Sequence, residues 1–246
     1  MPRPRVPPAR WLALAAGVLL AAVALVWVSW RVAAPPRDLR PVVFSYQPLW
    51  PFASRDEADR WTRDAPADGF AWHAESTALR FTRDYLGFSG VDQVTGTRID
   101  GSEAWVSVGF VLPNNAVATA ATLHLARFGS TADAPWEVVG SADDVLTIDT
   151  PSYGSAVGGR VIEAGGLVTG VDECLHLHAR QHSRADTVGE FSCVPAGGER
   201  SRWSGRLPLR DTDPGVLTVV VSTGGHVATV ERFAVTGLRV GPAAST

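Results

Sequence analysis

Four side chains that could bind a metal or form a redox pair lie close together: Cys174, His176, His178 and Cys193. On a β-strand, residues two apart face the same side, so the first three would form one row beside Cys193 on a neighbouring strand. A set of two cysteines and two histidines suits zinc. Because these ligands are two residues apart, unlike the wider cysteine spacing of most structural zinc sites, a zinc-binding module is kept as an alternative.

The same two cysteines are the only ones in the chain, and in an oxidising compartment they would form a disulfide. The bond would close a loop of about 20 residues and contribute about 3 kcal/mol in the chain-entropy model. The row of Leu175 and Leu177 would then face the protein core, and the histidine row would face water. We therefore predict a Cys174–Cys193 disulfide and no bound metal.

No recognised catalytic motif accompanies the remaining histidines, serines and acids. Residues 87–91, Gly-Phe-Ser-Gly-Val, have their second glycine, Gly90, one place too near the serine for a G-x-S-x-G nucleophile elbow. Neither H-E-x-x-H nor a phosphate-binding glycine loop occurs. His73 and His124 are expected at the surface. We predict no catalytic residue and no cofactor, with an envelope hydrolase whose site has no recognised motif as an alternative.

The location of the protein in the cell is indicated by an apolar run from Trp11 to Trp30, which contains no charged side chain. As a helix it would be about 30 Å long, the thickness of the hydrocarbon core of a bilayer. Trp11 lies at one end, and Trp27 and Trp30 lie at the other, where tryptophan favours the membrane interface. The run predicts a single transmembrane helix over residues 11–30.

A cleaved secretory signal is the alternative to this anchor. Its apolar core would be unusually long, and Pro35 would follow the only small-residue cleavage site, Val32-Ala33-Ala34. Arginines flank the run equally, and the free amino terminus and Asp38 favour a cytoplasmic tail of residues 1–10. We expect a single-pass protein of the cell membrane whose C-terminal domains are extracytoplasmic.

Charge further restricts the partners. Residues 41–246 contain 16 arginines and 24 acidic residues, a net charge of −8, and the whole chain lacks lysine. An acidic segment of this kind is a poor partner for nucleic acid, because the phosphate backbone binds clustered positive charge. Arginine without lysine indicates a GC-rich bacterial genome. The bilayer, contacted through residues 11–30, and an extracytoplasmic protein or cell-wall partner are the expected partners.

After a Pro/Arg-rich linker at residues 31–42, the periodicity predicts a small α+β domain over 43–141. Ser54 and Glu57 match a capping box that begins one helix, and Pro66 ends it. A second helix has Ala74, Ala78, Phe81 and Tyr85 on one face and ends at Gly87. Alternating apolar residues then predict a three-stranded antiparallel sheet over about 103–112, 117–128 and 136–139.

Residues 145–241 predict an all-β immunoglobulin-like sandwich, followed by a flexible tail at 242–246. Short apolar runs separated by turn residues predict seven strands. They are Leu146–Asp149, Val161–Ala164, Cys174–Ala179, Phe191–Val194, Arg206–Leu209, Leu217–Ser222 and Phe233–Val240.

Particular motifs in these strands and turns resemble a known family. Residues 147–151, 154–157, 165–170, 203–207 and 215–219 are similar to the immunoglobulin-like domain associated with bacterial spore germination proteins. The resemblance implies an extracytoplasmic domain that mediates interactions and has no catalytic residues. In the first domain, Trp50-Pro51-Phe52 and Tyr85-Leu86-Gly87-Phe88 resemble uncharacterised actinobacterial membrane proteins.

Taken with the anchor, these patterns favour a non-catalytic binding or scaffolding protein of the bacterial cell envelope, tethered by one helix. A tail of ten residues is too short to form a signalling domain, so a signal would have to pass through a partner.

Overall fold

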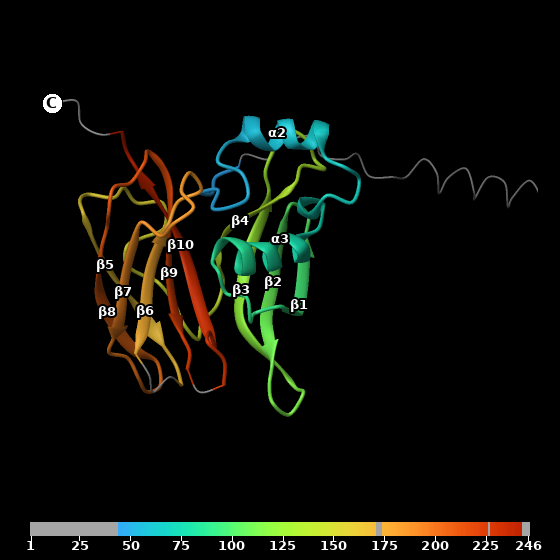
Figure 1. Cartoon of the computed structure of the whole chain (residues 1–246). Coiled ribbons are helices and arrows are strands. Elements are labelled where there is room, and N and C mark those ends of the chain that lie inside the picture. The colour runs from blue at the N-terminus through green and yellow to red at the C-terminus, as the bar shows by residue number, and fades with distance from the viewer. Residues whose placement is uncertain (1–43, 171–173, 226, 243–246) are drawn as a thin grey trace, which may run out of the picture. The chain divides into compact units, whose positions relative to one another are not determined.

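The computed structural model describes residues 44–170, 174–225 and 227–242, shown in colour in Figure 1. Residues 41–246 group into one compact unit. The predicted cytoplasmic tail, transmembrane helix and linker lie outside the described residues, as does most of the predicted C-terminal tail. Within the described ranges, no helix is both long enough and apolar enough to cross a bilayer.

The first module, residues 44–141, begins with two short helices. Helix α2 spans Arg55–Asp64 and helix α3 spans Ala74–Arg80, continued by a π-helical turn at Phe81–Tyr85. The predicted capping box is confirmed, because the Ser54 hydroxyl accepts the Glu57 amide and the Glu57 carboxylate accepts the Ala53 amide. The predicted second helix is also confirmed.

These helices accompany an antiparallel sheet of four strands in the order β1-β2-β3-β4. The strands are β1 Gln93–Asp100, β2 Glu103–Val111, β3 Val117–Arg127 and β4 Trp136–Ser141. The prediction of three strands is therefore wrong, because it omitted β1. Most side chains of this edge strand are exposed, so it lacks the apolar alternation by which strands are recognised.

The second module, residues 145–240, consists of antiparallel strands in two sheets, β10-β9-β6-β7 and β5-β8. Its strands are β5 Val161–Val168, β6 Leu175–Arg180, β7 Gly189–Val194, β8 Ser201–Pro208, β9 Gly215–Thr223 and β10 Arg232–Val240. Side chains from both sheets, including Leu177, Trp203 and Leu217, form one core. This arrangement is compatible with a β-sandwich.

Six of the seven strands predicted here are present, and the seventh, Leu146–Asp149, is not a regular strand. This segment runs beside β5, and isolated bridges at Leu146 and Thr150 and a few backbone hydrogen bonds, such as that from the Thr147 amide to the Leu167 carbonyl, join it to that strand. The Thr147 hydroxyl accepts the Leu167 amide, so a side chain replaces part of the backbone ladder.

The two modules pack against each other through the outer face of the β10-β9-β6-β7 sheet. Val220 and Phe233 of that face share a hydrophobic core with Phe81 and Tyr85 of the first module. The Tyr85 hydroxyl also lies 3.3 Å from the Thr218 hydroxyl, inside this core. The outer face of the sheet is therefore an interface between modules, and the cavities described below lie along it.

Candidate functional site

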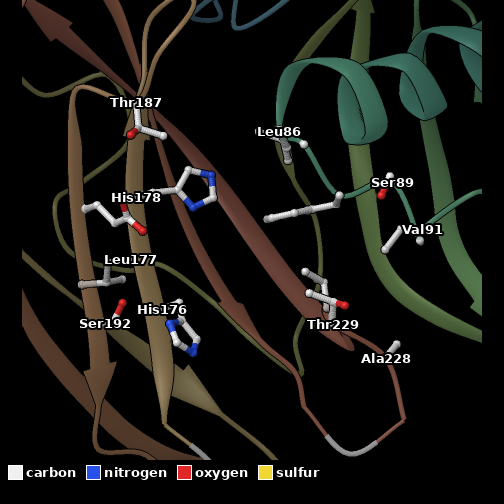
Figure 2. A pocket seen from close by; sticks show the side chains of 15 residues that line it. Leu86, Ser89, Val91, His176, Leu177, His178, Thr187, Ser192, Ala228 and Thr229 are labelled. Carbon is white, nitrogen blue, oxygen red and sulfur yellow. The ribbon is translucent and has the colours of Figure 1, made fainter.

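A cavity of about 440 Å³ lies between the modules. We call it the His178 cleft. One side is the turn after α3, residues 86–91, and the other is formed by β6, β7 and the loop before β10 (Figure 2). The lining residues are Leu86, Gly87, Phe88, Ser89, Gly90, Val91, His176, Leu177, His178, Thr187, Glu190, Ser192, Ala228, Thr229 and Val230.

The two sides of the His178 cleft differ in chemistry. Figure 2 shows Leu86 and Val91 on the side of the first module, facing His176, His178 and Ser192 of the second. Apart from one serine, the first side presents apolar atoms, whereas the second presents imidazoles and hydroxyls. A cleft of this size with an apolar wall and a few polar groups is typical of a small-molecule site.

His178 lies on β6 with its ring directed toward the first module (Figure 2). The Phe88 ring packs edge-on against it, with 5.7 Å between centroids. The Nε2 atom is buried and has no hydrogen-bond partner among the described residues. Burial, and secondly the positive charge of Arg180, lower the pKa of His178 to about 4. The imidazole is therefore neutral near pH 7.

Arg180 follows on the same face of β6, but its guanidinium contacts residues outside the lining of the His178 cleft. The guanidinium lies 5.2 Å from the centre of the Tyr85 ring and donates a 2.8 Å hydrogen bond to the Ala185 carbonyl. Arg180 does not line the cavity. It therefore keeps His178 neutral without offering a charge to a ligand.

None of the polar side chains that line the His178 cleft forms a side-chain hydrogen bond with another described residue. Seven side chains belong to this set: Ser89, His176, His178, Thr187, Glu190, Ser192 and Thr229. Five of them, Ser89, His176, Glu190, Ser192 and Thr229, are exposed to solvent, and the buried unpaired atom of the set is His178 Nε2. Natural proteins pair most of their buried polar atoms, so this unpaired atom beside a cavity is a signal of function. This set is available to a ligand.

A second cavity, of about 280 Å³, lies elsewhere along the same interface, and we call it the Tyr153 cleft. Apart from Thr236, the polar side chains of its lining are bonded within the protein. The Ser141 hydroxyl accepts the Val235 amide at 3.0 Å and donates to the Val235 carbonyl at 3.2 Å. The Tyr153 hydroxyl accepts the Gln47 amide at 2.6 Å.

Beside the Tyr153 cleft, Glu103 joins two lining residues, Tyr46 and His124. The Tyr46 hydroxyl donates to Glu103 Oε1 at 2.7 Å, and His124 Nε2 lies 3.1 Å from Oε2. The Tyr46 hydrogen bond, together with the bond from His124, holds the pKa of Glu103 below its usual value. The Trp105 ring is stacked on His124 with 5.0 Å between centroids. His124 is thus half-buried and partnered, which sequence reasoning missed.

A carboxylate–histidine pair is one part of a hydrolytic triad. The third part would be a hydroxyl bonded to His124, and none of the described residues provides one. Ser141 lines the same cavity, but its hydroxyl is bonded to the backbone of Val235. The geometry at His124 therefore does not favour the hydrolase alternative.

The predicted disulfide is confirmed, since Cys174 and Cys193 are bonded to each other. Both sulfurs are used, so the zinc set of Cys174, His176, His178 and Cys193 is not formed. Within the described ranges, no group of three or more histidine, cysteine or acidic side chains is placed to hold a metal ion. The leucine row faces the sandwich core as expected, but His178 faces the first module and not water.

The interface covers one face of β6, and this is why His178 is buried. The i, i+2 pattern places His176 and His178 on one face, but it cannot show that another module packs there. A comparison of the chain with protein-family models, curated proteins and solved structures gives no match.

Proposed function

We propose that the protein is a non-catalytic binding protein and that its ligand occupies the His178 cleft. The observation that carries this proposal is the buried His178 Nε2 atom, which has no hydrogen-bond partner among the described residues and lies beside a cavity of about 440 Å³. The ligand that fits such a cleft is a small molecule with an apolar body and at least one hydrogen-bonding group.

The energetics support this occupant. An unpaired buried polar group costs about 1–3 kcal/mol, and a ligand that bonds to His178 Nε2 would recover that cost. The apolar atoms of Leu86, Phe88 and Val91 would exclude water from the other side of the ligand. Each square ångström of apolar surface buried there contributes about 25 cal/mol.

The cellular setting in this proposal is the bacterial cell envelope. The apolar run at 11–30 would anchor the chain in the membrane, and residues 44–242 would lie outside the cytoplasm. The disulfide supports an oxidising compartment. The second module would be an immunoglobulin-like domain similar to that of spore germination proteins, and binding would be passed to an extracytoplasmic protein or cell-wall partner.

Blocking the cleft tests the proposal. Gly90 lines the cleft, and a Cβ added there meets no heavy atom within 4 Å, so Gly90→Phe would fill the cavity without displacing the backbone. Gly159→Phe is the matched control, because Gly159 is equally open and does not line the cleft. The full-length chain, in nanodiscs of zwitterionic lipid, would be titrated with para-fluorophenethyl alcohol and followed by fluorine NMR.

We expect the probe signal to broaden with the wild-type chain and with Gly159→Phe, beyond the broadening by empty nanodiscs. With Gly90→Phe, the excess broadening should disappear. Equal broadening by all three proteins would contradict binding in the cleft.

A further inference from the structure

The charge of the His178 cleft restricts its ligand further. Among the described residues of the lining, Glu190 is the only acidic one, and none is arginine or lysine. In the register of β6 and β7, Glu190 lies directly opposite His178. Both side chains therefore stand on the same face of the sheet, toward the cavity.

Several other polar groups of this wall are uncharged and can accept a hydrogen bond. His178 is uncharged near pH 7, because burial lowers its pKa to about 4. The hydroxyls of Thr187, Ser192 and Thr229 complete the set. Arg180, the nearest cation on the same strand, is bonded to the Ala185 carbonyl and lies against the Tyr85 ring.

We propose that the cleft binds a small organic cation with an apolar body, its ammonium group beside Glu190 and its body against Phe88 and Leu86. This inference rests on the proposed function and names the chemical class of its ligand. The carboxylate offers a cation a charge-assisted hydrogen bond. The opposite wall, with Leu86, Phe88 and Val91, provides the apolar contact that a fully polar cation could not use.

Other ligand classes fit the same cleft less well. An anionic head would meet the Glu190 carboxylate with no arginine in the lining to offset the repulsion. A neutral head would bond to the hydroxyls and the imidazole but would gain nothing from the charge. The order of affinity should therefore be cation, then neutral, then anion.

Three probes with one common body measure this order. Para-fluorophenethylamine, para-fluorophenethyl alcohol and para-fluorophenylpropanoate would each be titrated into the full-length chain in zwitterionic nanodiscs and followed by fluorine NMR. Glu190→Gln should weaken amine binding two- to fivefold, about the effect of one exposed carboxylate, and leave alcohol binding unchanged. Glu199→Gln is the control, because it removes the same charge from a residue outside the lining.

Each outcome decides between the two proposals. If Gly90→Phe abolishes binding of the alcohol or the propanoate, and either binds as tightly as the amine, the cation class is overturned while binding in the cleft stands. If Glu190→Gln and Glu199→Gln weaken the amine equally, only the overall negative charge attracts it, and the class is again overturned. If Gly90→Phe leaves the binding of all three probes unchanged, the proposed function itself fails.

Discussion

The His178 cleft and the Tyr153 cleft lie along the same interface between modules, yet their polar side chains differ in one respect. Around the Tyr153 cleft, Ser141 and Tyr153 are bonded to backbone groups, and His124 is bonded to Glu103. Around the His178 cleft, no polar lining side chain has such a partner among the described residues. Satisfied polar groups hold a structure together, whereas a buried atom without a partner, here His178 Nε2, costs stability unless a ligand pairs with it.

The two histidines show this difference most directly. His124 has a carboxylate 3.1 Å from its Nε2 atom, while Nε2 of His178 is buried without a partner. Removal of polar groups should therefore lower stability at the Tyr153 cleft and leave it nearly unchanged at the His178 cleft. Natural proteins commonly give up stability at binding sites, and the comparison predicts where this one does so.

The largest expected effect is a loss of stability in acid caused by His178. Folding lowers the pKa of His178 from 6.5 to about 4. Between these pH values the imidazole is protonated in the unfolded chain and neutral in the folded chain. The contribution of the neutral imidazole is complete above pH 6.5 and is lost as the pH falls to 4, by roughly 3–4 kcal/mol in all. Urea unfolding of the wild type and of His178→Leu across this range measures the difference.

Carboxylates also titrate in this range, so only the difference between the two proteins reports on His178. Glu103 has a lowered pKa and Glu137 a raised one, and both are present in both proteins. Parallel curves for the wild type and His178→Leu would mean that the imidazole is as accessible to protons as in the unfolded chain.

The disulfide should have the next largest effect. It ties β6 to β7, the two strands that carry His178 and Glu190, and its cysteines are 19 residues apart. Replacing both cysteines with alanine should lower the free energy of unfolding by about 3 kcal/mol, since a loop of that size is no longer closed in the unfolded chain. Urea unfolding under non-reducing conditions measures this loss.

Reduction provides a check on the cysteine variant. The wild type treated with dithiothreitol should unfold at the same urea concentration as the double alanine variant. A double variant as stable as the oxidised wild type would show that packing alone fixes the polar wall of the His178 cleft.

Removing a partnered hydroxyl from the Tyr153 cleft should cost less than either change above. Ser141→Ala removes the two hydrogen bonds that join the end of β4 to Val235 and leaves those backbone groups unpaired. The expected loss is about 2 kcal/mol in urea unfolding. Ser192→Ala is the counterpart in the His178 cleft and should change stability by less than about 0.5 kcal/mol.

The comparison between the clefts could not be made from the sequence, although several of its parts could. The disulfide followed from two cysteines in one presumed compartment, and the alternation in β2 and β3 followed from their apolar residues. Such local patterns depend on neighbours along the chain, so they can be recognised without knowledge of the tertiary structure.

What the sequence left unpredicted depends on contacts between distant segments. The edge strand β1 has no apolar face to reveal it. His178 and Phe88 are 90 positions apart, and only the packing of one module on the other brings their rings together. Glu103 and His124 are diagonal neighbours across β2 and β3, where His124 lies opposite Trp105, so an alignment of the two predicted strands in register would have placed that pair on one face.

The smallest effect, and the sharpest test of the comparison, comes from one substitution made at each cleft. Glu103→Gln replaces a carboxylate that accepts a hydrogen bond from Tyr46 and pairs with His124, so it should lower the free energy of unfolding by about 1 kcal/mol. Glu190→Gln makes the same chemical change where no described residue pairs with the side chain, so stability should stay within about 0.5 kcal/mol of the wild type.

The same two variants separate stability from binding. Glu190→Gln should weaken para-fluorophenethylamine binding, whereas Glu103→Gln should leave it unchanged, because Glu103 does not line the His178 cleft. Urea unfolding and fluorine NMR on the same preparations give both quantities. If Glu190→Gln lowered stability as much as Glu103→Gln did, Glu190 would have a structural partner. The His178 cleft would then be a satisfied interface like the Tyr153 cleft, and the basis for choosing it as the binding site would be lost.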